Sequence, residues 1–122
     1  MNKRDIHRIM DIKLYCEEAG ATIERFGKDF NIFKNDRDFL KSVSMSVYQI
    51  GEMSIRLSGE FKDSTKEKIP WNAMRAMRNL FAHEYSDMRK ENIWDVAIKE
   101  LPKLLLFCDE VIEEAKSKGV IE

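Results

Sequence analysis

Histidine, cysteine, proline and glycine are all scarce in this chain of 122 residues. It contains two histidines, two cysteines, two prolines and five glycines, and no apolar run approaches the roughly 18 residues that span a bilayer. So few glycines and prolines, with 43% hydrophobic and 35% charged residues, favour a helical protein over a β-sandwich or a disordered chain. We therefore expect an all-α fold, as one domain over residues 1–122.

The few residues that bind metals are also spread apart. Cys16 and Cys108 form no CxxC pair, so neither a zinc site nor a disulfide framework is indicated. Buried, reduced thiols fit this spacing better and indicate a reducing compartment. His7 has no carboxylate or cysteine at ligand spacing, and the charged start "MNKRDIHRIMDIK" lacks the apolar segment of a secretory signal. We expect a cytoplasmic protein that binds no metal and no cofactor.

Positive charge is not in excess over the whole chain. The formal net charge is -1, which excludes a dedicated duplex-DNA binder, because such proteins carry a strongly basic surface. Any nucleic acid must therefore be held by a local patch. Basic residues outnumber acidic ones between positions 62 and 90, and they are Lys62, Lys66, Lys68, Arg75, Arg78, Arg89 and Lys90.

Apolar residues recur in steps of three and four along two segments, a spacing that predicts two long amphipathic helices. The first stripe comprises Ile9, Ile12, Cys16, Ala19, Ile23 and Phe26, and the second Leu40, Val43, Val47, Ile50 and Leu57. We expect Asp5 to cap the first helix and Gly27 to end it in a left-handed conformation. For the second helix, Asn35 and Asp36 are candidate caps and Gly59 the expected end.

Two polar stretches separate the predicted helices. "GKDFNIFKNDRD" is short, so the helices on either side of it should be antiparallel neighbours. "GEFKDSTKEKIP" has no periodicity and predicts the one substantial loop. A third helix of about three turns should follow from Trp71. Because Pro102 interrupts the last apolar stripe, we expect a helix at about 91–100 and a longer one to about 117. The prediction is an up-and-down bundle of four to five helices.

The stretch "MRNLFAHEYSD" combines an arginine, an amide, a histidine and a tyrosine. Arg78 and His83 would point about 140° apart on a continuous helix, so they meet only if the helix ends or tightens between them. We therefore expect Arg78 in the last turns of a helix, with His83 and Tyr85 on the outgoing segment. A histidine at such a place also serves as a simple C-terminal cap of the helix.

The chemistry of these four side chains suits a phosphodiester. Arg78 offers a planar, permanently charged donor fork, and His83 both takes and gives a proton near neutral pH. Tyr85 adds a phenol and Asn79 an amide beside the arginine. Tyr48 and Glu52, one turn apart on the second predicted helix, are candidates to line a cleft.

"RNLFAHEY" resembles the signature of the HEPN superfamily, an Arg followed after four to six residues by His. The Tyr two positions after the His is the form found in HepT-like toxins. The resemblance extends over "IPWNAMRAMRNLFAHEY" and "IWDVAIKELPKL", with a tryptophan, the RN pair, the His-x-Tyr, a second tryptophan and a leucine-proline step. It implies an all-α up-and-down bundle, usually a homodimer, encoded beside a minimal nucleotidyltransferase as a toxin-antitoxin pair.

The leading hypothesis is a metal-independent endoribonuclease. His83 would act as general base or general acid and Arg78 would stabilise charge in the transition state, while Asn79 and Tyr85 position the phosphate. Each chain has one motif histidine, and a two-fold dimer would bring two copies to one cleft. The resemblance further implies that the partner nucleotidyltransferase transfers AMP to Tyr85. The rival hypothesis is a non-catalytic helical subunit that binds nucleotides or accompanies the nucleotidyltransferase.

Overall fold

The computed structural model of the chain describes residues 1–122 and contains helices only. The predicted all-α bundle is therefore confirmed. The elements are, in order, α1 (Lys3–Phe26), α2 (Phe30–Asn35), α3 (Arg37–Ile55), α4 (Gly59–Thr65), α5 (Trp71–Glu84), a 3-10 turn (Tyr85–Asp87), α6 (Lys90–Asp95), a π-helical turn (Val96–Glu100) and α7 (Leu101–Ser117).

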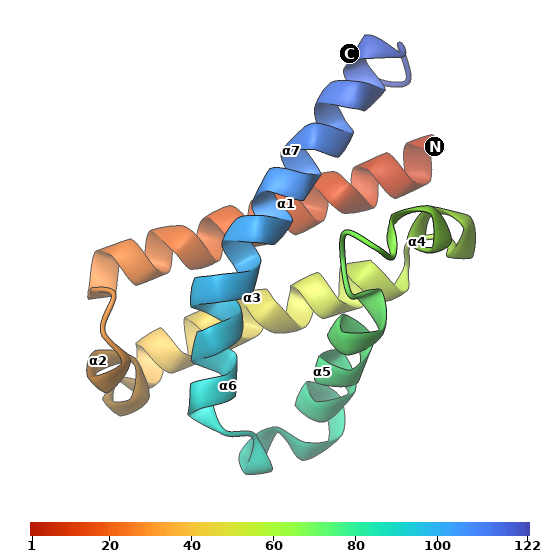
Figure 1. Ribbon diagram of the computed structural model, residues 1–122. Helices are drawn as coiled ribbons and strands as arrows, with labels where there is room; N and C mark the ends of the chain where they lie inside the picture. Colours follow the sequence, from red (N-terminus) through yellow and green to blue (C-terminus); the bar gives the residue numbers. More distant parts are fainter.

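The core lies where α1 packs between α3 and α7 (Figure 1). Helices α1 and α3 run antiparallel, as the short connection between them predicts. The inward stripe of α1 is the predicted one extended by one residue, since Ile6 joins it with no exposed surface. An aromatic cluster closes the end of the core near α2, and it consists of Phe26, Phe30, Phe33, Phe39 and Trp94.

The ends of the two long helices differ from the prediction in detail. Asn2, not Asp5, caps α1, because its side chain accepts a hydrogen bond from the backbone N–H of Asp5 at 2.7 Å. Gly27 ends α1 with a positive φ of 106°, but its ψ of 138° lies outside the left-handed helical region. Asp36 caps α3 as predicted, whereas Gly59 begins α4 instead of ending α3.

Both stretches predicted as connections contain a short helix. The Asp29 side chain caps α2, and the Ser58 side chain caps α4 by accepting from the N–H of Phe61 at 3.2 Å. Asp5 then fixes α4 to the start of α1, because its carboxylate accepts from the N–H and the hydroxyl of Ser58 at 2.8 and 2.6 Å. The buried Asp5 therefore has a structural partner instead of a capping role in its own helix.

The predicted interruption at Pro102 takes the form of a π-helical turn. Proline has no N–H to donate and its ring clashes with the carbonyl one turn before it. The chain accommodates this by widening residues Val96–Glu100, where the N–H of Leu101 bonds the carbonyl of Val96. α6 and this turn cover residues 90–100 and α7 covers residues 101–117, so the predicted bounds are confirmed, and the two helices join without a loop between them.

Helix α5 lies at the side of this core and packs against α3 (Figure 1). Its first residue, Trp71, is buried and donates from Nε1 to the hydroxyl of Thr65 at 2.9 Å. The Trp71 ring also packs near Phe61 and Phe107, which ties the start of α5 to α4 and α7. The rest of α5 has no other buried residue. No helix of the structure is both long enough and apolar enough to cross a membrane.

Candidate functional site

Helix α5 lies close against α3 at Gly51. A Cβ atom at this position would lie 2.7 Å from the Cβ of Arg78, closer than real Cβ contacts, so only glycine fits here without a shift. This approach sets Arg78 beside the next residue of α3, and its Nε donates a hydrogen bond to Glu52 Oε1. The position of the arginine is therefore determined by the seam between α3 and α5.

The pair formed by Arg78 and Glu52 changes the electrostatics of both groups. The hydrogen bond from Arg78, together with its charge, holds the pKa of Glu52 below the ordinary glutamate value. In return, the hydrogen bond to Glu52 raises the pKa of Arg78 above its already high value. Both side chains keep some contact with solvent, with 28% of Arg78 and 19% of Glu52 exposed. Arg78 is thus charged and partly neutralised by a fixed carboxylate.

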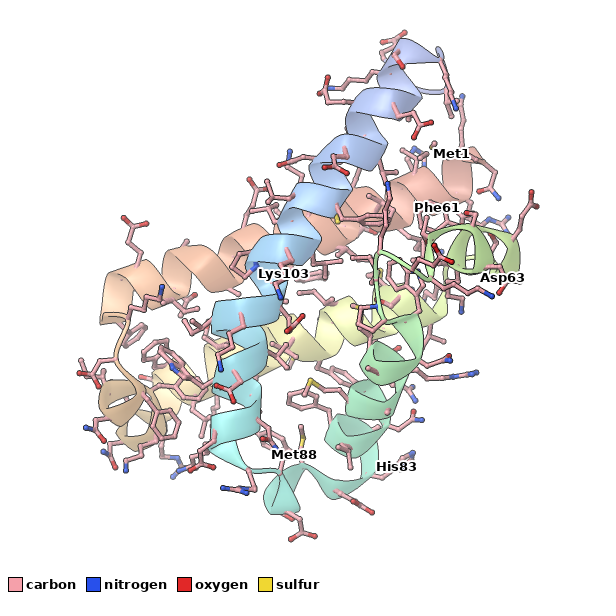
Figure 2. The ribbon with its side chains drawn as sticks, in the orientation of Figure 1. Met1, Phe61, Asp63, His83, Met88 and Lys103 are labelled. Atoms are coloured by element: carbon pink, nitrogen blue, oxygen red, sulfur yellow. The ribbon has the colours of Figure 1, made fainter.

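Asn79 extends the cluster toward the outer face of α5. The Arg78 Nη1 donates a hydrogen bond to Asn79 Oδ1 at 3.0 Å. His83 follows Asn79 by one helical turn on the same face, because residues four apart are neighbours on a helix. His83 lies exposed near the end of α5 (Figure 2). Its side chain takes part in no side-chain hydrogen bond of the structure, and as the basic residue of the last turn it lies at the negative end of the helix dipole.

The predicted convergence of Arg78 and His83 does not occur within one chain. The helix continues through both residues to Glu84, so their side chains point about 140° apart. Tyr85 begins the 3-10 turn and stacks on Phe81, with ring centroids 5.7 Å apart. Arg78 in the last turns and Tyr85 on the outgoing segment are as predicted, whereas His83 is still helical. Tyr85 lies on the side of Arg78, and His83 lies on the outer face.

Glu52 was a candidate to line a cleft, but the sequence did not predict that Arg78 would be its partner. The spacing of Tyr48 and Glu52 predicted that both lie on one face of α3, and a hydrogen bond from the Tyr48 side chain also helps to lower the pKa of Glu52. Tyr48 lines a groove with Phe81 and Tyr85, while Glu52 pairs with Arg78. The only signal in the sequence for the pairing of Glu52 with Arg78 is that Glu52 directly follows Gly51 within a helix.

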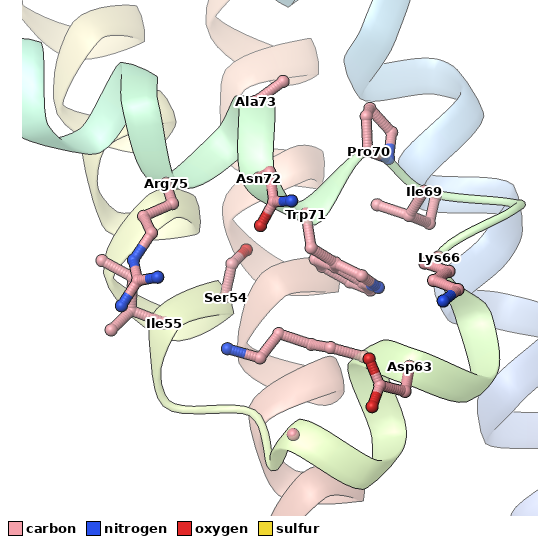
Figure 3. A pocket seen from close by; sticks show the side chains of 12 residues that line it. Ser54, Ile55, Asp63, Lys66, Ile69, Pro70, Trp71, Asn72, Ala73 and Arg75 are labelled. Carbon is pink, nitrogen blue, oxygen red and sulfur yellow. The ribbon is translucent and has the colours of Figure 1, made fainter.

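The beginning of α5 carries a second polar feature, a pocket whose charged lining residues are three cations, Lys62, Lys66 and Arg75, and one carboxylate, Asp63. We call it the cationic pocket. It has a volume of about 440 Å³. Figure 3 shows Arg75 on one side and Lys66 on the other, with the Trp71 indole between them. None of the three cations has a salt-bridge partner. Part of the predicted basic patch therefore gathers in one place, one turn before Arg78.

The remaining titratable clusters offer no metal site. No group of three or more His, Cys, Asp or Glu side chains is arranged to hold a metal ion. Cys16 and Cys108 are both buried, and burial raises the pKa of Cys16 to about 12 and that of Cys108 still further. Both thiols are therefore protonated and unreactive at neutral pH.

The comparisons with known proteins agree with one another. A sequence model described as "Ribonuclease HepT-like" matches residues 15–111. A "Putative RNase" of Caldanaerobacter subterraneus subsp. tengcongensis is 31% identical over 101 residues, which cover 82% of this chain and 89% of that protein. Another protein of the same description, from Methanocaldococcus jannaschii, is 28% identical over 89 residues, 73% of each chain. No solved structure matches the chain.

The family match covers all of α2 to α6, and with them the Arg78–Asn79 pair, His83 and Tyr85. The helical structure is of the kind that this family adopts. The chain therefore belongs to the HepT-like ribonuclease family.

Proposed function

We propose that this protein is the toxin of a toxin-antitoxin pair and a metal-independent endoribonuclease of the cytoplasm. The observation that carries the proposal is the Arg78–Asn79 pair with the free, exposed His83 one turn further along the same helix. An exposed imidazole without a partner is available to exchange a proton, and a fixed guanidinium is available to bind a phosphate.

In the proposed reaction a ribose 2′-oxygen attacks the adjacent phosphorus while His83 takes the 2′ proton. Charge that develops on the phosphate oxygens is stabilised by the Arg78 guanidinium, and Asn79 and Tyr85 position the phosphate. The bond to the 5′-oxygen breaks, and that oxygen leaves with a proton from a second imidazole. The products are a 2′,3′-cyclic phosphate and a 5′-hydroxyl. No metal takes part in these steps.

The second imidazole is supplied by a homodimer. On α5, the face opposite α3 exposes Ala76 and Leu80 next to Asn79 and His83. A second copy packed on this face would cover the two apolar side chains and bring the partner subunit's His83 toward the same phosphate. The wide angle between Arg78 and His83 within one chain also favours a site completed by two chains.

The test is cleavage of RNA in EDTA by the wild-type protein and by His83→Ala. We expect the variant to lose about 10²- to 10⁴-fold in rate, the usual contribution of general acid–base catalysis. His7→Ala is the matched control, because it removes the other histidine of the chain, which lies on the exposed side of α1. Equal cleavage by wild type and His83→Ala, or no cleavage by either, contradicts the proposal.

Regulation by a partner nucleotidyltransferase is the second part of the proposal. Tyr85 is 43% exposed, so its hydroxyl is accessible as an acceptor. Its oxygen would attack the α-phosphorus of ATP, lose its proton and release pyrophosphate. The attached AMP would place negative charge and bulk beside Arg78 and block RNA.

Mass spectrometry after incubation with the partner and Mg-ATP checks this step. We expect wild type and Tyr15→Phe to gain the mass of AMP, because Tyr15 lies on α1 and outside the site. Tyr85→Phe should stay unmodified, and modification of that variant at the wild-type level would refute the assignment.

A non-catalytic subunit of a nucleotidyltransferase complex is the second candidate function, and one observation favours it. Arg78 is already hydrogen-bonded to Glu52, so a phosphate must share Arg78 with Glu52 or displace the Glu52 carboxylate. The EDTA assay separates the two candidates, since a non-catalytic subunit that binds nucleotides or the nucleotidyltransferase does not cleave RNA. A neighbouring gene for a small nucleotidyltransferase supports either candidate, and cleavage supports only the first.

A further inference from the structure

We propose that the groove between α3 and the end of α5 binds one unpaired nucleobase of a single-stranded RNA. The aromatic groove is defined by its seven lining residues and has a volume of about 470 Å³, enough for a small aromatic ligand. They are Lys41, Ser44, Met45, Tyr48, Phe81, Ala82 and Tyr85. The inference rests on the proposed function, because it names the part of the substrate that this site recognises.

Three rings line the groove in sequence. Tyr48 lies 6.0 Å from Phe81 between ring centroids, and Phe81 lies 5.7 Å from Tyr85 in a stacked arrangement with an interplanar angle of 23°. The groove also exposes large apolar surface, since Met45 is 57% exposed next to Tyr85. Ring faces at the edge of a groove are the surfaces on which unpaired bases stack.

A polar group in the groove wall lacks a partner. Ser44 is only 4% exposed, and its buried hydroxyl has no hydrogen bond to any group of the chain. Leaving a buried hydroxyl unpaired is costly, and such groups are usually paired with protein or ordered water. The Ser44 oxygen is closed to solvent, so the edge of a nucleobase would reach it only after Ser44 turns toward the groove.

The charges beside the groove suit a nucleic acid strand. None of its lining residues is acidic, and Lys41 lies at the end away from Arg78. Arg75, Arg78 and Ala82 follow one edge of α5 at steps of three or four residues, and Tyr85 begins the turn directly after this helix. A strand along this edge would pass from the cationic pocket to Arg78 and then to the aromatic groove. The groove would hold the base on one side of the phosphate at Arg78.

The first experiment uses a short single-stranded oligonucleotide with every ribose 2′-O-methylated, so that it cannot be cleaved. A 5-iodouracil placed at successive positions is photocrosslinked to the wild-type protein, and the attached peptide is identified by mass spectrometry. We expect one position to crosslink to Tyr48, Phe81 or Tyr85. Crosslinks that lie only elsewhere, or an oligonucleotide that does not bind, would overturn the inference.

The second experiment measures affinity by fluorescence anisotropy for Phe81→Leu, which removes the ring and keeps an apolar side chain. We expect binding to weaken by about tenfold or more, in the range of base–aromatic stacking. Phe81→Tyr keeps a ring and should restore most of the affinity. Leu106→Ala, which changes an exposed apolar residue of α7, should bind as wild type does.

An oligonucleotide that lacks the base at the crosslinked position completes the test. It should bind wild type and Phe81→Leu equally, because the ring then has no base to contact. If Phe81→Leu weakens both oligonucleotides to the same extent, the ring only supports the structure and the inference is wrong. If Phe81→Leu instead converts a dimer to monomers, a second copy of the chain covers the groove and the inference is also wrong.

These measurements do not depend on cleavage, so the two proposals fail separately. Binding through the groove without any His83-dependent cleavage leaves the inference standing and contradicts the nuclease. Cleavage that depends on His83, together with an unchanged affinity of Phe81→Leu, supports the nuclease and contradicts the inference about the groove.

Discussion

Helix α1 buries seven residues over 24 positions, whereas α5 buries only Trp71 over 14. The first helix lies between α3 and α7, and the second is attached by its first turn and by one seam with α3. α5 nevertheless carries most of the groups proposed to act on RNA. The molecule thus separates the part that provides stability from the part proposed to act on RNA, and the contact between α3 and α5 at Gly51 joins the two.

The largest effect on stability should come from the core. Phe39 is fully buried and contacts the rings of Phe26, Phe33 and Trp94. We expect Phe39→Ala to lower the free energy of unfolding by about 3–5 kcal/mol, because it leaves a cavity. Urea unfolding followed by circular dichroism measures this. Leu106→Ala, at an exposed position, should stay within about 0.5 kcal/mol of wild type. A Phe39→Ala variant as stable as Leu106→Ala would show that this core does not provide most of the stability.

A substitution at Gly51, where α3 and α5 meet, should have an intermediate effect on stability and should also weaken RNA binding. In Gly51→Ala the new methyl group meets Arg78, and overpacking of this kind costs about 1–3 kcal/mol. Gly20→Ala is the matched control, since its Cβ meets nothing within 4 Å, and it should gain up to about 1 kcal/mol from helix propensity. Gly51→Ala should also lose RNA affinity because Arg78 moves. If both variants gain stability, the close approach at Gly51 is wrong.

The smallest expected effect concerns the charge pair alone and appears as a pH dependence. The pKa of Glu52 is lowered in the folded chain from an ordinary value of 4.5 by the hydrogen bond and charge of Arg78. The pair therefore stabilises the fold fully above pH 4.5, and this stability is lost as the pH falls through the lowered pKa.

Urea unfolding of wild type and Glu52→Gln at a series of pH values measures this contribution. The difference in free energy of unfolding should be constant above pH 4.5 and shrink below it. Glu24→Gln is the control, because Glu24 is exposed on α1 and forms no salt bridge. A difference between wild type and Glu52→Gln that does not change with pH would mean that Glu52 acts without its charge.

Sequence periodicity predicted the long helices because each runs through four or more turns with one apolar face. The helices α2 and α4 have six and seven residues, too few for a repeating stripe. Their caps, Asp29 and Ser58, were the available signals. The π-helical turn could not be predicted, because a proline indicates a disturbed helix but not whether the helix ends or its turns widen.

For the candidate site, the sequence predicted the residues but not how their side chains are oriented. Its residue types were evident from "RNLFAHEY", and the orientation of each side chain depended on where α5 ends. The helix continues past His83, so the imidazole faces away from Arg78. The pairing of Arg78 with Glu52 depends on the register of α5 along α3, and that register follows from a contact between distant segments at Gly51.

The bond between Asp5 and Ser58 links positions 53 residues apart and has a consequence for the order of folding. The cap of α4 is complete only after the start of α1 has docked, and contacts between such distant positions form slowly. We expect α1 and α3 to gain protection from hydrogen exchange before α4 during refolding. Helix α5 is tied to α4 by the bond from Trp71 to Thr65, so we expect its first turn to gain protection no earlier than α4 does.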